Sequence, residues 1–147
     1  MKHQFVLIIH LLAASVWVGG HLFLSFRLLP EALKKKEASI IINFKNKFEP
    51  VGMPALVILL LTGIIMAYDF GVPVSDWFSF GSPIERLVSL KLSLLLLTFI
   101  LAINAQLFVF PKLTSDKLNP VAFQIIAVTM VGVTMLILGS FFRLGGV

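Results

Sequence analysis

The sequence predicts an all-α, polytopic membrane protein built as a bundle of four transmembrane helices. Its 147 residues are 59% hydrophobic and only 13% charged, and the mean hydropathy of +1.02 is too high for a water-soluble domain of this size. Four apolar runs of roughly 20 residues, the length that crosses a bilayer, alternate with shorter polar connections. These runs use almost the whole chain, so we expect a single four-helix domain over residues 1–147.

Each predicted span is bounded by residues that interrupt apolar helices. Pro30 closes the first run, and we expect the charged stretch that follows it, residues 31–50, to lie at the membrane interface. The first run is too long for a signal peptide and lacks a small-residue cleavage site. Charged residues, proline or glycine bound the other runs. The predicted spans are residues 3–29, 51–68, 87–110 and 121–142.

The positions of lysine and arginine predict the orientation of the bundle, because such residues in short connections stay on the cytoplasmic side. Only three of these residues lie at the end of the predicted bundle where both chain termini lie: Lys2, Arg86 and Arg143. The connections at the opposite ends hold Arg27, Lys34, Lys35, Lys36, Lys45, Lys47, Lys112 and Lys117. We therefore expect a bacterial inner (plasma) membrane protein with both termini outside, in the periplasm, and we attribute the net charge of +5 to topology rather than to a nucleic-acid partner.

All three histidines, His3, His10 and His21, belong to the first span. Spacings of 7 and 11 residues return to nearly the same face of a helix, and Trp17 shares that face. Ionisable side chains inside a span normally face the bundle interior, where they serve ion paths, proton relays or cofactors. His10 and His21 are roughly 16 Å apart along the axis, too far to share one metal ion. The stripe therefore predicts two separate ion-binding positions, or stations. The alternative for His10 and His21 is that the rings only hydrogen-bond across the bundle. For His3 the alternative is a role at the membrane interface.

Side chains at matching depths complete the candidate sites: Met66, Lys91 and Met135 share the depth of His10, and Met53, Asn104 and Gln124 share the depth of His21. Imidazole and thioether groups suit copper, the softer sulfur favours the cuprous ion, and the chain contains no cysteine. Alternatively, the methionines only fill space in the core, and the amide side chains only hydrogen-bond between helices. Glu49 is a candidate exit ligand at the cytoplasmic mouth or a solvated carboxylate. The candidate metal ligands are His10, His21, His3, Met66 and Met53, and the candidate polar path is Trp17, Asn104, Gln124 and Glu49.

A haem b cofactor is the second interpretation of the same residues. Four-helix bundles hold haem between facing side chains, and the protein would then be a redox protein or oxidase that uses a membrane-dissolved reductant. Because every histidine lies on one helix, ligation would require histidine with Lys91, histidine with methionine, or a histidine from a second copy of the chain. The candidate haem ligands are His10, Lys91 and His21, although Lys91 is also placed to snorkel towards headgroups. A third interpretation is an accessory subunit in which the polar groups only secure packing.

Four segments carry a family resemblance: HLLAASVWVGGHLFLSFRLLPEAL from residue 10, KFEPVGMPALVILLLTGIIMAY, SLKLSLLLLTFILA and FPKLT. Together they resemble the copper resistance protein D (CopD) family over essentially the whole chain. The resemblance implies a four-helix bundle that handles copper, with His10, His21 and His3 as ligand candidates. Asn104 stands where members of that family often have a histidine. A shorter match, which involves His10 and Lys91, resembles the HemJ family of haem-containing protoporphyrinogen oxidases.

The leading hypothesis is a copper-handling membrane protein that binds a copper ion and passes it through a His-lined site inside the membrane. The chain shows no phosphate-binding glycine loop, so a gradient or a partner would have to drive any passage. The expected partners are the lipid bilayer and the copper ion, with a second copy of the chain or a copper chaperone as further candidates.

Overall fold

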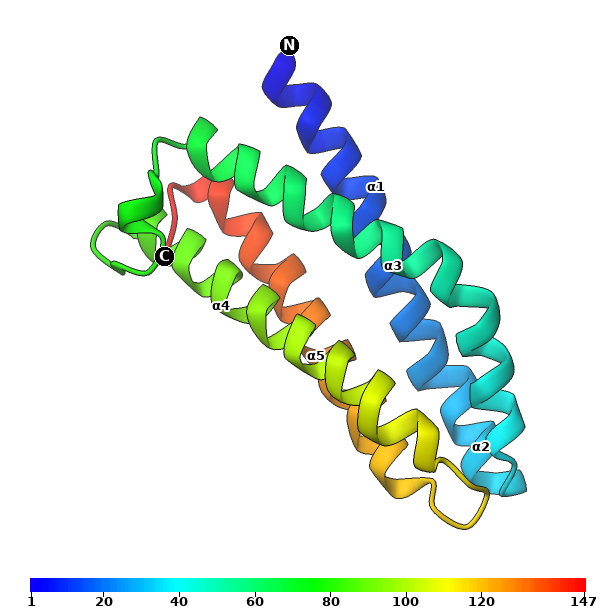
Figure 1. The fold of residues 1–147 in the computed structure, drawn as a ribbon. Coiled ribbons are helices and arrows are strands. Elements are labelled where there is room, and N and C mark those ends of the chain that lie inside the picture. Colours follow the sequence, from blue (N-terminus) through cyan, green and yellow to red (C-terminus); the bar gives the residue numbers. More distant parts are fainter.

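A computed structural model describes residues 1–147 and contains helices but no strands. The α-helices are α1 (Lys2–Phe23), α2 (Leu29–Lys35), α3 (Ala38–Asp69), α4 (Pro83–Asn104) and α5 (Asn119–Ser140) (Figure 1). Two π-helical turns, Leu24–Leu28 and Ala105–Val109, continue α1 into α2 and α4 beyond its end, and short 3₁₀ turns are Val74–Asp76, Phe110–Lys112 and Phe141–Leu144. Four rods result, Lys2–Lys35, Ala38–Asp69, Pro83–Lys112 and Asn119–Leu144, each long and apolar enough to cross a membrane. The predicted fold class is confirmed.

Local sequence explains where the rods begin and end. Lys36 adopts the left-handed conformation with φ 54°, and the next residue is extended, which turns the chain between α2 and α3. α4 begins with a capping box, in which the Ser82 hydroxyl accepts from the Glu85 backbone N–H and the Glu85 carboxylate accepts from the Ser82 N–H. Pro83 in the first turn of α4 has no N–H to leave unpaired, as is usual at this position.

The helices extend well beyond the predicted spans, and the charged stretch at residues 31–50 is mostly helical. Pro30 lies in the first turn of α2, so it does not end the first rod. α3 begins at Ala38 and contains both Pro50 and Pro54 in its interior. The reason is packing. Ala38 and Ile41 lie on one face of the helix in this lysine-rich region, and both are buried against the bundle. This extension of α3 brings residues 41–53 to the functional site.

α1 and α5 form the middle of the bundle. α3 and α5 contact α1, α4 packs on α5, and α3 has few direct backbone contacts with α4. Figure 1 shows both chain termini towards the same end of the bundle, which we call the terminal end. At the opposite end, which we call the basic end, α2 and the connection of residues 113–118 lie close to the lysine-rich start of α3.

Three apolar clusters follow one another along the bundle. The largest, at the basic end, joins the first rod to α3 and α5 and includes Leu29 and Ile41. The second lies in the middle around Trp17 and Leu56, and a small one lies at the terminal end around Ala67. Many other apolar side chains remain exposed on the outside of the rods, as a protein surrounded by lipid requires. The candidate site lies between the first and second clusters.

Candidate functional site

The three histidines of α1 all face α3. The contacts are His3 Nδ1 to Asp69 Oδ2 at 2.9 Å, His10 Nδ1 to Thr62 Oγ1 at 2.7 Å, and the His21 ring to the Phe48 ring with centroids 5.8 Å apart. Because all three partners belong to α3, the stripe lies along the α1–α3 interface. The three rings therefore occupy three different depths of one helix pair.

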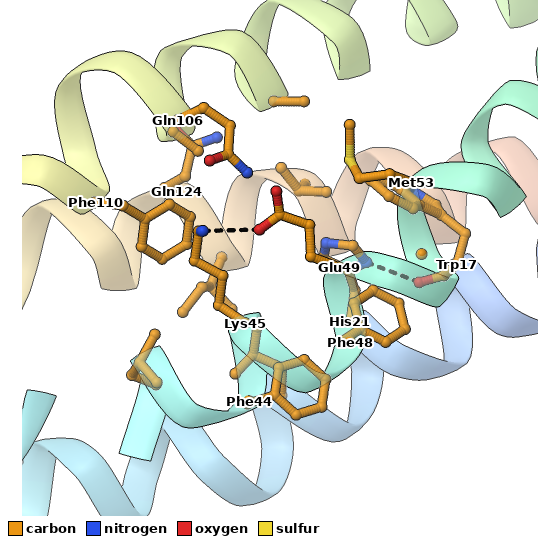
Figure 2. A pocket seen from close by; sticks show the side chains of 17 residues that line it. Trp17, His21, Phe44, Lys45, Phe48, Glu49, Met53, Gln106, Phe110 and Gln124 are labelled. Atoms are coloured by element: carbon orange, nitrogen blue, oxygen red, sulfur yellow. Dashed lines mark hydrogen bonds and ion pairs between the residues drawn. The ribbon is translucent and has the colours of Figure 1, made fainter. Parts of the chain in front are cut away.

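His21 presents a free ring nitrogen to a cavity. Its Nδ1 lies 2.7 Å from the backbone carbonyl of Trp17, which can only accept, so Nδ1 carries the proton. The neutral ring then has a lone pair on Nε2. Figure 2 shows this second nitrogen pointing away from Trp17, towards Glu49. Histidines that bind a metal through one nitrogen normally donate from the other to a carbonyl or carboxylate, and the Nδ1 of His21 makes a contact of this kind.

His10 has the same tautomer but different surroundings. The Thr62 hydroxyl donates to the Ile58 carbonyl at 2.6 Å, so it must accept from His10 Nδ1–H. Gly63 leaves room beside the ring, since a Cβ there would lie 3.8 Å from His10 Cε1. The ring is thus oriented firmly, but among these contacts no sulfur or carboxylate lies beside it.

All four rods contribute to the wall of the cavity that His21 faces, which we call the His21 cavity. Its volume is about 100 Å³ and 17 residues line it, 11 of them hydrophobic. The side chains with polar or sulfur atoms are His21, Lys45, Glu49, Met53, Gln106 and Gln124, and Trp17 also lines it (Figure 2). Five of the predicted site residues, His21, Met53, Glu49, Gln124 and Trp17, are thus brought together.

A phenylalanine ring held between two glycines forms one wall of the cavity. A Cβ at Gly20 of α1 would overlap one edge of the Phe48 ring, and a Cβ at Gly52 of α3 would overlap the other edge. The ring also stacks on Phe44, with centroids 5.2 Å apart. By contrast, a Cβ at Gly19 would have no neighbour within 4 Å. Gly20 and Gly52 therefore let Phe48 fill the space beside His21.

Lys45 and Glu49 form an ion pair in the cavity wall. Lys45 Nζ lies 2.7 Å from Glu49 Oε2, and the two residues are one turn apart on α3. The ammonium also lies 5.0 Å from the centroid of the Phe110 ring, within cation–π range. Figure 2 shows the Gln106 amide pointing towards the same carboxylate. Glu49 is therefore held by groups from two rods.

The amides of the predicted polar path form a separate, structural pair. Asn104 Nδ2 donates to Gln124 Oε1 at 3.1 Å, and Gln124 Nε2 donates to the Leu101 carbonyl at 2.6 Å. Gln124 is buried and lines the cavity, whereas Asn104 does not line it. Asn104 thus acts through Gln124, whose amide it orients.

The two π-helical turns flank the cavity. Leu24 and Ala105, the first residues of these turns, both line it. Beside the first turn, Ser25 and Thr129 share a hydrogen bond of 2.6 Å that joins the first rod to α5. The Thr129 hydroxyl also lies 3.3 Å from the His21 carbonyl. π-Helical turns of this kind are frequent at functional sites because they shift the side chains that follow them.

Besides His10, three other predicted site residues lie outside the cavity, towards the terminal end. His3 pairs with Asp69 and its side chain is 43% exposed. Met66 is buried in α3 but does not line the cavity. Lys91 Nζ lies 5.5 Å from the centroid of the Phe142 ring and near Gly139.

Lys45 and Phe48 line the cavity but are not among the residues that the sequence predicts for the site. In the sequence Lys45 serves only as a topological charge, because the prediction places residues 31–50 in an interfacial connection. The spacing of Lys45 and Glu49, four residues apart, is the usual signal of an ion pair on one helix face. It would have indicated the pair if α3 had been extended to Ala38.

The donor set in the cavity is mixed. Nowhere in the structure do three or more His, Cys, Asp or Glu side chains converge. A metal ion here would find one imidazole nitrogen from His21, one thioether from Met53 and one carboxylate from Glu49. Imidazole and thioether suit copper better than they suit magnesium or calcium.

One comparison with known proteins gave a match. The sequence model of the family described as copper resistance protein D matches residues 42–142, which is more than half of the chain. The matched region includes Lys45, Glu49 and Met53, whereas His10 and His21 precede it. No curated protein and no solved structure matches the chain.

Proposed function

The chain belongs to the copper resistance protein D family of membrane proteins, and on this premise we propose that it binds a copper ion in the His21 cavity and passes it along the α1–α3 interface. His21 Nε2, the Met53 sulfur and the Glu49 carboxylate are the proposed ligands. His10 is the proposed second station towards the terminal end. His3, Met66 and the Gln124 amide are proposed as further polar or sulfur contacts along the route.

The observation that carries the proposal is the free Nε2 of His21. Its Nδ1 is committed to the Trp17 carbonyl, so the lone pair points into a cavity that also contains a thioether and a carboxylate. Phe48 packs against the ring and limits its rotation. An imidazole that is already oriented loses less entropy when it binds an ion.

Two stations are needed because His10 and His21 are three helical turns apart, roughly 16 Å along the axis. Both rings donate from Nδ1 and leave Nε2 unprotonated. Stepwise exchange between weak ligands would let an ion leave one station for the next. Thr62 and the Trp17 carbonyl would hold the two rings in the tautomer that such exchange requires.

A groove on α3 offers a route between the cavity and the outside of the bundle. It is lined by Asn46, Glu49, Pro50, Met53 and Pro54, so it shares Glu49 and Met53 with the cavity. Proline has no N–H, so Pro50 and Pro54 deprive the carbonyls of Asn46 and Pro50 of their helical donors. Free carbonyl oxygens are tolerated inside a membrane where they line a cavity. Here they would assist a cation that moves past Glu49.

The proposal is tested with purified protein in detergent micelles. Titration with Ag⁺, a redox-inert substitute for the cuprous ion, in competition with a chromophoric chelator gives an affinity. We expect Met53→Leu to weaken binding by about tenfold or more, a loss typical of metal-site changes. Met130→Leu is the matched control, because Met130 is exposed on α5 and lies outside the cavity.

Two results would overturn the proposal. One is wild-type protein that binds neither Ag⁺ nor copper under reducing or oxidising conditions. The other is equal affinity of the Met53→Leu and Met130→Leu variants. An optical spectrum of the same preparation separates copper from haem, because a haem protein shows a Soret band.

A further inference from the structure

The His21 cavity contains one positive and one negative side chain. Of the 17 lining residues, only Lys45 and Glu49 are charged when His21 is neutral. The two charged atoms lie 2.7 Å apart. The side chains that line the cavity therefore carry no net charge.

From this balance we infer that the cavity selects a monovalent soft cation, the cuprous ion, over divalent cations such as cupric or zinc ions. The inference rests on the proposed function, in which His21, Met53 and Glu49 bind the ion. A monovalent ion in a neutral cavity leaves one uncompensated charge, and a divalent ion leaves two. The free energy of an uncompensated charge in a medium of low dielectric constant rises steeply with its magnitude, so the divalent ion is disfavoured more.

Lys45 is the residue that sets this charge balance. Its ammonium cancels the attraction that Glu49 would otherwise exert, and it repels a divalent ion twice as strongly as a monovalent one at the same distance. The Phe110 ring, 5.0 Å from Nζ, offers the ammonium a second favourable contact beside Glu49. The side chain is only 23% exposed, so it remains in the wall. Lys45 is thus a specificity-determining residue that does not itself bind the ion.

The neutral ligands strengthen the preference. The His21 imidazole and the Met53 thioether contribute no charge to offset that of a divalent ion. The thioether also favours the cuprous ion over zinc, because the thioether sulfur and the cuprous ion are both soft. Charge and softness therefore select the same ion.

The substitution Lys45→Gln tests the inference, because it changes the net charge of the lining side chains from zero to minus one. Affinities for Ag⁺ and Zn²⁺ are measured by competition titration on the wild-type and variant proteins in detergent micelles. We expect the Zn²⁺ affinity to rise by at least about tenfold relative to the Ag⁺ affinity, because the added attraction doubles for a divalent ion. Lys45→Arg keeps the charge and should keep the wild-type ratio.

Lys47→Gln is the matched control. Lys47 is exposed on the same helix and does not line the cavity, so this variant loses the same charge from the protein without changing the site. Equal Zn²⁺ to Ag⁺ ratios in Lys45→Gln and Lys47→Gln would overturn the inference and leave the copper site standing. A wild-type protein that prefers Zn²⁺ over Ag⁺ would overturn it as well. Wild-type protein that binds no Ag⁺ and no copper would instead overturn the proposed function.

Discussion

Each half of the bundle contains a histidine of α1 in the same tautomer, but the residues around the two rings differ. Towards the basic end, His21 faces a cavity with a thioether, an ion pair and two amides. Towards the terminal end, His10 bonds to Thr62, and Lys91 packs near Phe142. The imidazole alone therefore does not distinguish the two positions.

The surroundings of His21 and His10 differ because different α3 residues face the two rings. Phe48, between Gly20 and Gly52, packs beside His21 and leaves one nitrogen of the ring directed into the cavity. Near His10, the closest polar partner is a hydroxyl whose proton is already committed to a backbone carbonyl. We infer that the basic-end half binds the ion more tightly and that His10 serves as the weaker station.

The largest expected effect tests this ranking directly. His21→Gln should weaken Ag⁺ binding by about 100-fold, because the loss of a ligand costs at least as much as the loss of a supporting contact. His10→Gln should weaken it by no more than about tenfold, the lower limit of the same range. Competition titration of both variants gives the two ratios. Equal losses would mean that the two stations are equivalent and would remove the distinction between the halves.

A pair of adjacent glycines sharpens the comparison through stability. Gly20→Ala should destabilise the protein by about 2 kcal/mol, because the new methyl group overlaps a Phe48 ring that Gly52 confines on its other edge. Gly19→Ala has open space and should be neutral or stabilising by up to about 1 kcal/mol, the helix-propensity difference. Thermal unfolding in detergent measures both. Similar midpoints for the two variants would show that Phe48 is free to move.

The smallest expected effect concerns the terminal-end half. Thr62→Val removes the acceptor of His10 Nδ1–H and should destabilise the protein by about 1 kcal/mol, a usual value for a hydrogen bond between helices. Thr134→Val is the control, because its hydroxyl bonds only to the Met130 carbonyl of its own helix. Ag⁺ affinity at the His21 cavity should stay within a factor of about two. A large loss of affinity in Thr62→Val would couple the two halves.

Much of the fold could be predicted from composition and periodicity. Four apolar runs in a chain of 147 residues leave room for little except four membrane helices. The helix limits could not be predicted as well, because proline was read as a terminator. Pro50 and Pro54 instead lie inside α3, where packing of Ala38 and Ile41 extends the helix through a lysine-rich segment.

Part of the candidate site could also be predicted. The stripe of three histidines needed only helical spacing, and matching depths placed Met53 and Gln124 beside His21. Depth cannot show which side chains face each other: the sequence places Met66 and Lys91 at the depth of His10, but it does not indicate that Thr62 is the hydrogen-bond partner of that ring. The sequence does not indicate a role for Lys45, because that role depends on Glu49 one turn away in a part of α3 that lies outside the predicted span.

The sequence by itself determined the membrane character, the number of spans and the helix that carries the imidazoles, because hydropathy and helical periodicity are local properties of the chain. Only the tertiary structure decided which ring nitrogen is free, that Phe48 lies between two glycines, and that an ion pair cancels the charge of the cavity. The ion pair and the contact of His21 with Trp17 each lie within one helix, but the cavity that they face is enclosed by side chains from all four rods. Spacing along the chain indicates contacts within a helix, but it does not show which helices meet around the cavity.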